Sequence, residues 1–265
     1  MPKLPFAAAL CLSTLVLTAA RADAQILPAE DHVVEVAVMG WRVSPDFVLS
    51  TEAIPDASVN DVDFVQEFGL GDKTLPAFRA VIGGVHKLRI GYASLKYDAD
   101  TTIQRTFTYR NRTFTVNAPA STDINWTLWT FGYEWDLLSR EYGFLGAIVD
   151  LKYNKVEALI DSPALESPSP VETHTTVVVP TLGAIGRAYL TPAVAITGEF
   201  TGFRVNVSDL EVNSVDFDVY GTISFGRNYA VQGGYRSFAI DYLVKKDSGG
   251  DLKMRGPYIG GVLRF

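Results

Sequence analysis

The chain ends in the stretch Tyr258-Ile259-Gly260-Gly261-Val262-Leu263-Arg264-Phe265, and this stretch decides the fold class. Successive side chains of a β-strand point to opposite faces, so Ile259, Leu263 and Phe265 share one face while Tyr258 and Arg264 share the other. A water-soluble domain has little reason to finish on a strand with a bare aromatic residue. We therefore interpret the stretch as the closing strand of a β-barrel.

The start of the chain predicts export. Lys3 gives a basic first region, residues 6–20 form a short apolar run, and Ala22-Asp23-Ala24 provides an A-x-A cleavage site. We expect a cleaved signal peptide over residues 1–24 and a single barrel domain over residues 25–265. The one cysteine, Cys11, falls inside the predicted signal, so we expect a mature domain without a disulfide.

Alternating apolar and polar residues predict strands along the rest of the chain. The segments are 33–44, 77–84, 88–104, 112–136, 142–158, 173–190, 193–205, 214–227, 229–244 and 252–265. Long connections, at 45–76, 105–111, 159–172, 206–213 and 245–251, alternate with short ones. This pattern predicts an all-β, antiparallel up-and-down transmembrane β-barrel of about ten strands, with short periplasmic turns and long extracellular loops.

The first long connection holds one structured element in this interpretation. Residues 62–70 are apolar enough to fold back over the mouth of the barrel, as a short helix or strand that ends at Gly69 and Gly71. Asn60, Asp61 and Asp63 resemble a calcium loop only faintly, because the spacing and the required glycine of an EF-hand are missing. We expect no metal site and no cofactor.

Aromatic residues are expected to form two belts where a barrel meets the two surfaces of a membrane. Odd positions from Trp129 to Trp135 are aromatic, whereas even positions there include Thr130 and Glu134. The residues assigned to the belts are Trp126, Trp129, Tyr133, Trp135, Tyr189 and Tyr258.

The opposite faces of the strands bring charges of both signs into the predicted lumen. The expected lumen-lining residues are Glu35, Arg79, Arg89, Glu134, Asp150, Lys152, Arg187, Glu199, Asp216, Asp218, Arg236 and Arg264. The interior of a barrel of about ten strands is barely wider than its own side chains, and open channels appear at about 16–18 strands. We expect paired charges to fill the lumen; a narrow ion or solute path is the alternative.

None of the three histidines suggests catalysis. His32 and His86 are placed at the periplasmic rim, and His174 at the extracellular rim. His174 has neither the Asp-x-His arrangement of omptin-type proteases nor a His-x-Ser arrangement, since Thr175 and Thr176 follow it. We predict no catalytic residue and no enzyme; a surface hydrolase of lipid or peptide that uses His174 remains the alternative.

The predicted signal, the strand alternation, the loop asymmetry and the terminal Phe265 resemble the small bacterial outer-membrane β-barrel proteins, the broad group that includes the OmpA- and OmpW-like barrels. The resemblance implies an outer-membrane location, contact with outer-membrane lipid, and recognition of Ile259, Leu263 and Phe265 by the barrel-assembly machinery. It implies a structural or surface-interaction protein, or a narrow channel for small solutes. The net charge of −7 argues against nucleic acid as a partner, and the oligomeric state is left open.

Overall fold

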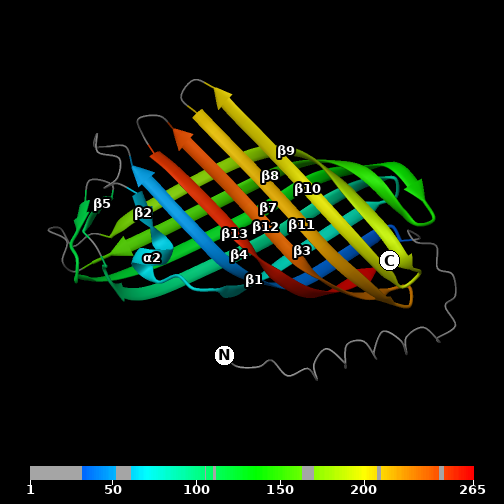
Figure 1. Ribbon diagram of the computed structural model, residues 1–265, viewed down its shortest axis with the longest axis horizontal. Helices are drawn as coiled ribbons and strands as arrows, with labels where there is room; N and C mark the ends of the chain where they lie inside the picture. The colour runs from blue at the N-terminus through cyan, green and yellow to red at the C-terminus, as the bar shows by residue number, and fades with distance from the viewer. Residues whose placement is uncertain are drawn as a thin grey trace, which may run out of the picture.

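The computed structural model describes residues 32–51, 61–104, 106–109, 112–162, 170–207, 210–244 and 248–265. The predicted signal peptide lies outside this part of the chain. Within it, ten long antiparallel strands form a closed barrel (Figure 1). They are β1 (Val34–Thr51), β3 (Lys73–Gly83), β4 (His86–Thr102), β7 (Pro119–Arg140), β8 (Gly143–Asp161), β9 (Val171–Thr191), β10 (Val194–Val207), β11 (Leu210–Phe225), β12 (Tyr229–Val244) and β13 (Ser248–Arg264).

The barrel closes between its first and last strands. β1 pairs with β13 from Glu35 opposite Arg264 to Thr51 opposite Ser248. The Phe265 carbonyl oxygen accepts hydrogen bonds from the Val33 and Val34 backbone N–H groups at 2.7 and 3.0 Å. The final residue is therefore part of the seam, and the first and last strands begin and end at one rim, which we call the terminal end.

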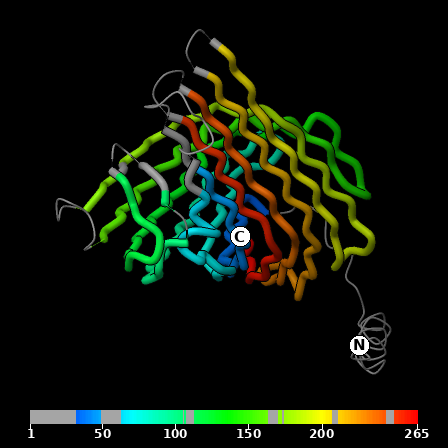
Figure 2. The backbone as a smooth tube through the Cα atoms, turned by 60° about the vertical axis from the view of Figure 1, so that its left-hand side comes forward, coloured from blue at the N-terminus to red at the C-terminus, as the bar shows by residue number. Residues whose placement is uncertain are grey.

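The structure confirms the fold class and refines its boundaries. The expected strand 112–136 is wrong at its start, because β5 (Phe107–Tyr109) and β6 (Arg112–Phe114) form a separate small hairpin before β7. The expected loops 206–213 and 245–251 are too long, because β10 to β13 continue into them (Figure 2). Within the described residues, no helix has the length and apolarity needed to cross a bilayer.

Side chains of the terminal half of the barrel follow the membrane-barrel pattern. On β7 the odd residues from Trp129 to Leu137 point outward and are mostly exposed, while Glu134 and Asp136 point inward and are buried. Exposed apolar side chains continue this outward belt on the other strands, including Val38, Leu88, Val149, Leu182, Phe200, Phe217, Val231 and Ile259. An apolar outer face of this kind is suited to contact with lipid.

The half of the barrel at the opposite end, which we call the loop half, reverses this pattern within the same strands. On β7 the inward residues from Ala120 to Leu128 are buried and mostly apolar, whereas the outward residues include Asp123 and Asn125. On β8, Val156 and Ile160, which lie beyond Asn154 toward the loop end, are likewise buried. The loop half thus has an apolar core and a polar outer face, as a water-soluble barrel does.

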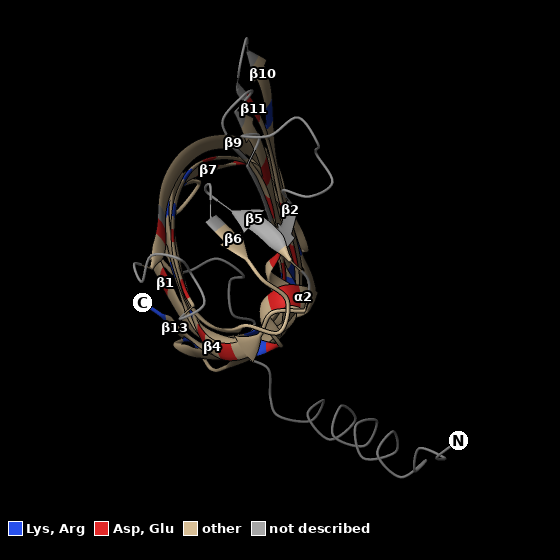
Figure 3. Ribbon diagram, turned by 90° about the vertical axis from the view of Figure 1, so that its left-hand side faces the viewer, with Lys and Arg blue, Asp and Glu red and all other residues tan. Residues whose placement is uncertain are grey.

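A short helix covers the mouth of the loop half, as expected from the sequence. In α2 (Phe64–Phe68), the Asp63 carboxylate accepts hydrogen bonds from the Val65 and Gln66 N–H groups at 3.0 Å, and Gly69 ends the helix at φ 66°. Asp63 thus caps a helix end whose N–H groups have no helical partner. Phe64 and Phe68 are each 1% exposed, and α2 packs against β1 and β4. Figure 3 shows α2 at the mouth of the barrel.

A second contact ties down the chain that follows α2. The Tyr97 hydroxyl on β4 donates a hydrogen bond to the Gly71 carbonyl oxygen. Burial, with Asp72 nearby, raises the pKa of Tyr97 to about 12, so the phenol keeps the proton that it donates.

Three of the six residues assigned to the belts, Trp126, Tyr189 and Tyr258, are corrected by the structure. Trp126 and Tyr258 point into the barrel and are 1% and 7% exposed. Tyr189 has the same parity as Arg187 on β9 and is only half-buried. Trp129, Tyr133 and Trp135 do lie in the exposed belt. The aromatic character of a residue was thus a weaker guide than its parity within the strand.

Candidate functional site

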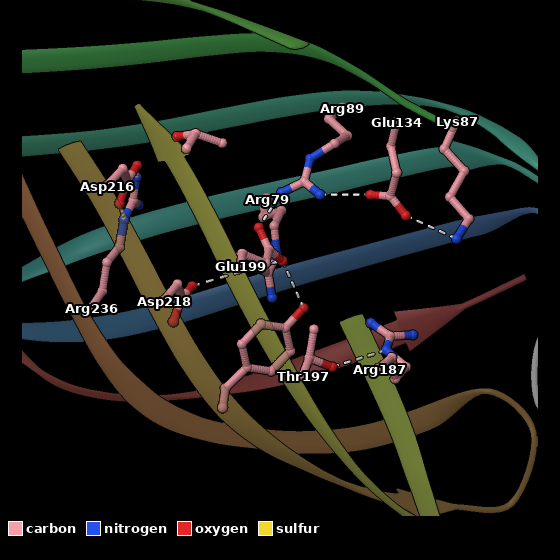
Figure 4. Close-up of polar contacts among 12 residues, drawn as sticks. Arg79, Lys87, Arg89, Glu134, Arg187, Thr197, Glu199, Asp216, Asp218 and Arg236 are labelled. Carbon is pink, nitrogen blue, oxygen red and sulfur yellow. Dashed lines mark hydrogen bonds and ion pairs between the residues drawn. The ribbon is translucent and has the colours of Figure 1, made fainter. Parts of the chain in front are cut away.

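The lumen of the terminal half contains several clusters of ion pairs (Figure 4). At its centre the Arg79 guanidinium lies 3.2 Å from a Glu199 carboxylate oxygen and 3.6 Å from an Asp218 carboxylate oxygen. The Tyr220 hydroxyl donates to Glu199 at 3.0 Å, and the Tyr258 hydroxyl donates to Asp218 at 2.9 Å. Each central carboxylate therefore has a cation and a phenol as partners, which offsets part of the cost of burying its charge.

A second cluster continues the network toward the terminal end. The Arg89 guanidinium pairs with Glu199 and lies 2.6 Å from Glu134. The Lys87 ammonium bridges Glu134 and Asp136 at 3.0 and 2.8 Å. One carboxylate, Glu134, is thus shared by two cations.

The seam strands add a third cluster at the terminal end. The Glu35 carboxylate lies 2.8 Å from the Arg264 guanidinium and 3.6 Å from that of Arg187. The Arg187 Nε–H also donates to the Thr197 hydroxyl at 3.0 Å. Arg264 belongs to the closing strand, so this ion pair joins the two ends of the barrel across the seam.

A fourth cluster forms the upper boundary of the charged lumen. The Asp216 carboxylate accepts from the Lys152 ammonium at 2.5 Å and from the Arg236 guanidinium at 2.7 and 3.0 Å. The Lys152 ammonium also donates to the Thr201 hydroxyl at 2.9 Å. Arg236 stacks at 5.3 Å from the ring centre of Trp41, where the apolar core begins.

All twelve residues assigned to the lumen from the sequence point inward in the structure, and eleven of them form the ion pairs described above. Asp150 is the exception: it is 5% exposed, and its Oδ1 atom has no hydrogen-bond partner within the described part of the chain. Sequence reasoning missed Lys87, Asp136, Tyr220 and Tyr258. Strand alternation could have found them, because each lies an even number of residues from a residue of the same strand that was assigned to the lumen.

Above the charged clusters the lumen is filled by apolar side chains. Trp41, Trp126, Phe238 and Met254 are at most 1% exposed, and Phe64 and Phe68 of α2 close the top. A cavity of about 70 Å³ lies where the two fillings meet, between Trp41 and Leu128 on one side and Arg89, Asp150 and Glu199 on the other. It has room for a few water molecules.

Two of the three histidines lie on the outer face, and His32 lies beside Glu35 at the terminal end of the lumen. His174 is on the outer face of β9, with a side chain 65% exposed, and its ring nitrogens lie 3.4 and 3.5 Å from Glu157 and Glu172. His86 lies 2.6 Å from the Tyr133 hydroxyl on the outer face, and His32 lies 3.5 Å from Glu35. The contacts of His174 with two carboxylates do not form a nucleophile–base pair.

The closed barrel, its apolar outer belt and its ion-paired lumen define the fold of an outer-membrane β-barrel protein. No family model matches the sequence, and no curated protein matches it either. Among solved structures, the outer membrane protease OmpT from Escherichia coli is similar with a TM-score of 0.58 at 9% identity, covering 89% of this chain and 97% of OmpT. At this identity the likeness shows the fold alone.

Two further outer-membrane barrels align less well. The translocator domain of the autotransporter NalP from Neisseria meningitidis has a TM-score of 0.41 at 11% identity, with 98% of this chain and 97% of that domain covered. The attachment invasion locus protein Ail of Yersinia pestis has a TM-score of 0.36 at 9% identity, with 88% and 98% covered. The grouping with OmpA- and OmpW-like barrels is only approximate.

Proposed function

We propose that this protein is a non-enzymatic barrel of the bacterial outer membrane, with a closed lumen, that works as a structural and surface-interaction protein. The observation that carries the proposal is that side chains fill both halves of the lumen. Ion-paired side chains occupy the terminal half, and a tightly packed apolar core with α2 on top occupies the loop half.

The two fillings argue against a solute path for different reasons. A hydrated ion passing the apolar core would lose its water without gaining hydrogen bonds. In the terminal half, an ion would have to displace partners from charges that are already paired. Within the described residues the narrow-channel interpretation therefore has no continuous polar route to support it, whereas the packed loop half offers a surface on which contacts can form.

The experiment is single-channel recording of the refolded protein in a planar bilayer, for which we expect no steady conductance steps. Insertion is verified on the same preparation with brominated lipids, which quench nearby tryptophans. Trp129 and Trp135 lie in the outer belt, whereas Trp41 and Trp126 are 1% exposed in the core. Quenching should survive in W41F/W126F and disappear in W129F/W135F.

Steady, resolvable steps from protein that passes this insertion test would overturn the closed-lumen proposal. Quenching that depends on Trp41 and Trp126 would instead overturn the assignment of the outer belt to lipid.

A further inference from the structure

The wall of the barrel is incomplete between β9 and β10. These two strands pair from Val194 opposite Thr191 only as far as Gly202 opposite Leu182. β9 nevertheless continues to Val171 along β8, and β10 continues to Val207 along β11. Figures 1 and 2 show the β10–β11 hairpin diverging from β9 above this point. We call the interval between Thr175–Thr181 of β9 and Phe203–Asn206 of β10 the slot.

Both edges of the slot are free for sheet pairing in the described part of the chain. Residues 175–181 of β9 pair only with β8, and residues 203–206 of β10 pair only with β11. An edge of this kind presents backbone N–H and C=O groups in the spacing that another strand requires. Pro180 lies on the β9 edge, where it has no N–H to leave unpaired.

The slot also opens the apolar core of the loop half. Val177 of β9 and Phe203 and Val205 of β10 point inward but are only half-buried, whereas the inward Val156 and Ile160 of β8 are buried. Below the slot, a pocket of about 20 Å³ is lined by Asn154, Val156, Thr175, Val177, Ile240, Tyr242 and Leu252. The interior therefore offers apolar contacts to side chains that enter at alternate positions.

A polar group without a partner lies in this pocket. Asn154 is 3% exposed, and neither its Nδ2 nor its Oδ1 atom has a hydrogen-bond partner within the described residues. A buried amide without hydrogen-bond partners is destabilising. Both a donor and an acceptor are thus available to whatever enters the slot.

We propose that the β9 edge from Thr175 to Thr181 is a strand-addition site, where an extended segment of a partner protein completes the wall between β9 and β10. The inward side chains of the partner segment are apolar and pack over Val177 and Phe203. The outward side chains of the segment are polar, because the outer face beside the site carries charges of both signs, on Lys155, Glu157 and Glu172. This inference names the kind of partner that the proposed surface-interaction function requires, and so rests on that function.

The occupant is a peptide because the edges offer main-chain hydrogen bonds. An apolar molecule such as an acyl chain could fill the interior but could not pair with backbone N–H and C=O groups. The pairing of β9 with β8 continues past Pro180, whose nitrogen carries no hydrogen to donate. The Pro180 nitrogen therefore faces the slot and not β8, as is usual for a proline in a sheet. Thr176 and Val178 share this parity, so their N–H groups also point into the slot.

The test uses a fluorescent heptapeptide in which valine alternates with lysine and threonine, added to the refolded protein in detergent. Anisotropy should show saturable binding. The same peptide with N-methylated amides keeps every side chain but loses its donors, and should bind at least tenfold more weakly. Thr176→Pro should weaken binding of the unmodified peptide by a similar factor, whereas Thr176→Ala, which keeps the N–H, should not.

Two results would overturn the proposal. Equal binding of the normal and N-methylated peptides would mean that the slot takes an apolar ligand without strand pairing. Absence of binding by any alternating peptide would mean that the edge accepts no strand. Because the N-methylated control uses unchanged protein, the test does not depend on Thr176→Pro folding.

A separate measurement asks whether the slot simply closes on itself. If the existing register continued, Val179 would lie opposite Val205, and V179C/V205C would form a disulfide. We expect the free protein to keep both thiols, and rapid disulfide formation without peptide would overturn the proposal. None of these outcomes depends on conductance, so the strand-addition site and the closed lumen can fail independently.

Discussion

Removing the charge of Asp216 should destabilise the barrel more than removing that of its partner Lys152. Asp216→Asn keeps the shape of the side chain but leaves the Lys152 and Arg236 cations facing a neutral amide. Lys152→Met removes one cation and leaves Asp216 held by Arg236 through two hydrogen bonds of 2.7 and 3.0 Å. The two variants therefore differ in how many buried charges they leave without a counterion.

The expected sizes follow from this difference. Breaking a buried ion pair so that charge is left uncompensated costs about 3–5 kcal/mol, which we expect for Asp216→Asn. Lys152→Met loses one charged hydrogen bond to Asp216 and one to Thr201, but Asp216 keeps Arg236 as its counterion. We expect about 1–2 kcal/mol for this variant. The double variant should cost less than the sum, since both substitutions act on one interaction.

Equilibrium unfolding of the refolded protein in detergent, followed by tryptophan fluorescence, measures these free energies. The tryptophan signal reports on the region around Asp216. The Trp41 ring centre lies 5.3 Å from the Arg236 guanidinium carbon, and the ring centres of Trp126 and Phe238 lie 5.9 Å apart. Thr127→Ala, on the outer face of β7, serves as the control and should change stability by less than about 0.5 kcal/mol. A cost for Lys152→Met equal to or above that for Asp216→Asn would refute the argument.

Two further predictions concern the loop half. Phe68→Ala should lower the free energy of unfolding by about 3 kcal/mol or more, because it opens a cavity under α2. Gln66→Ala, on the exposed side of α2, is the control and should leave the free energy of unfolding unchanged. Equal urea midpoints for the two variants would contradict the packing of α2 over the mouth of the barrel. Burial and the facing Asp251 raise the pKa of Asp241, so the folded state favours its protonated form and loses stability as pH rises through that pKa. Asp241→Asn should therefore stabilise by about 0.2–1 kcal/mol at pH 7 and by nothing below pH of about 4; an equal gain at both pH values would contradict it.

The strand count and the charged lumen could be predicted from the sequence because both depend on a local period. Alternation of side chains is a property of each strand alone, so Glu134 or Asp218 could be assigned to a face without knowing its neighbours. The cap over the mouth was accessible for the same reason, since Asp63 and Gly69 are local start and stop signals of a helix.

The reversal between the two halves was missed although the sequence contains its signal. Leu128 and Trp129 are adjacent apolar residues at which the apolar parity of β7 changes from even to odd. We assigned Trp126 to the lipid belt because it is aromatic, although its even position places it on the same face of β7 as Glu134.

The slot could not be predicted at all from strand patterns. Its existence depends on where the pairing of β9 with β10 ends, and that is a property of two strands rather than of either one. Pro180 is the only local feature that points to a free edge there.

The reversal also sets how far the protein reaches from the membrane. On β7, residues 119–128 lie above the belt, and ten residues of strand tilted by about 40° rise by roughly 25 Å. The mouth of the barrel is therefore held at about the height of a small folded domain above the lipid surface. A molecule that approaches the barrel from its loop end therefore meets the sheet well before it meets lipid.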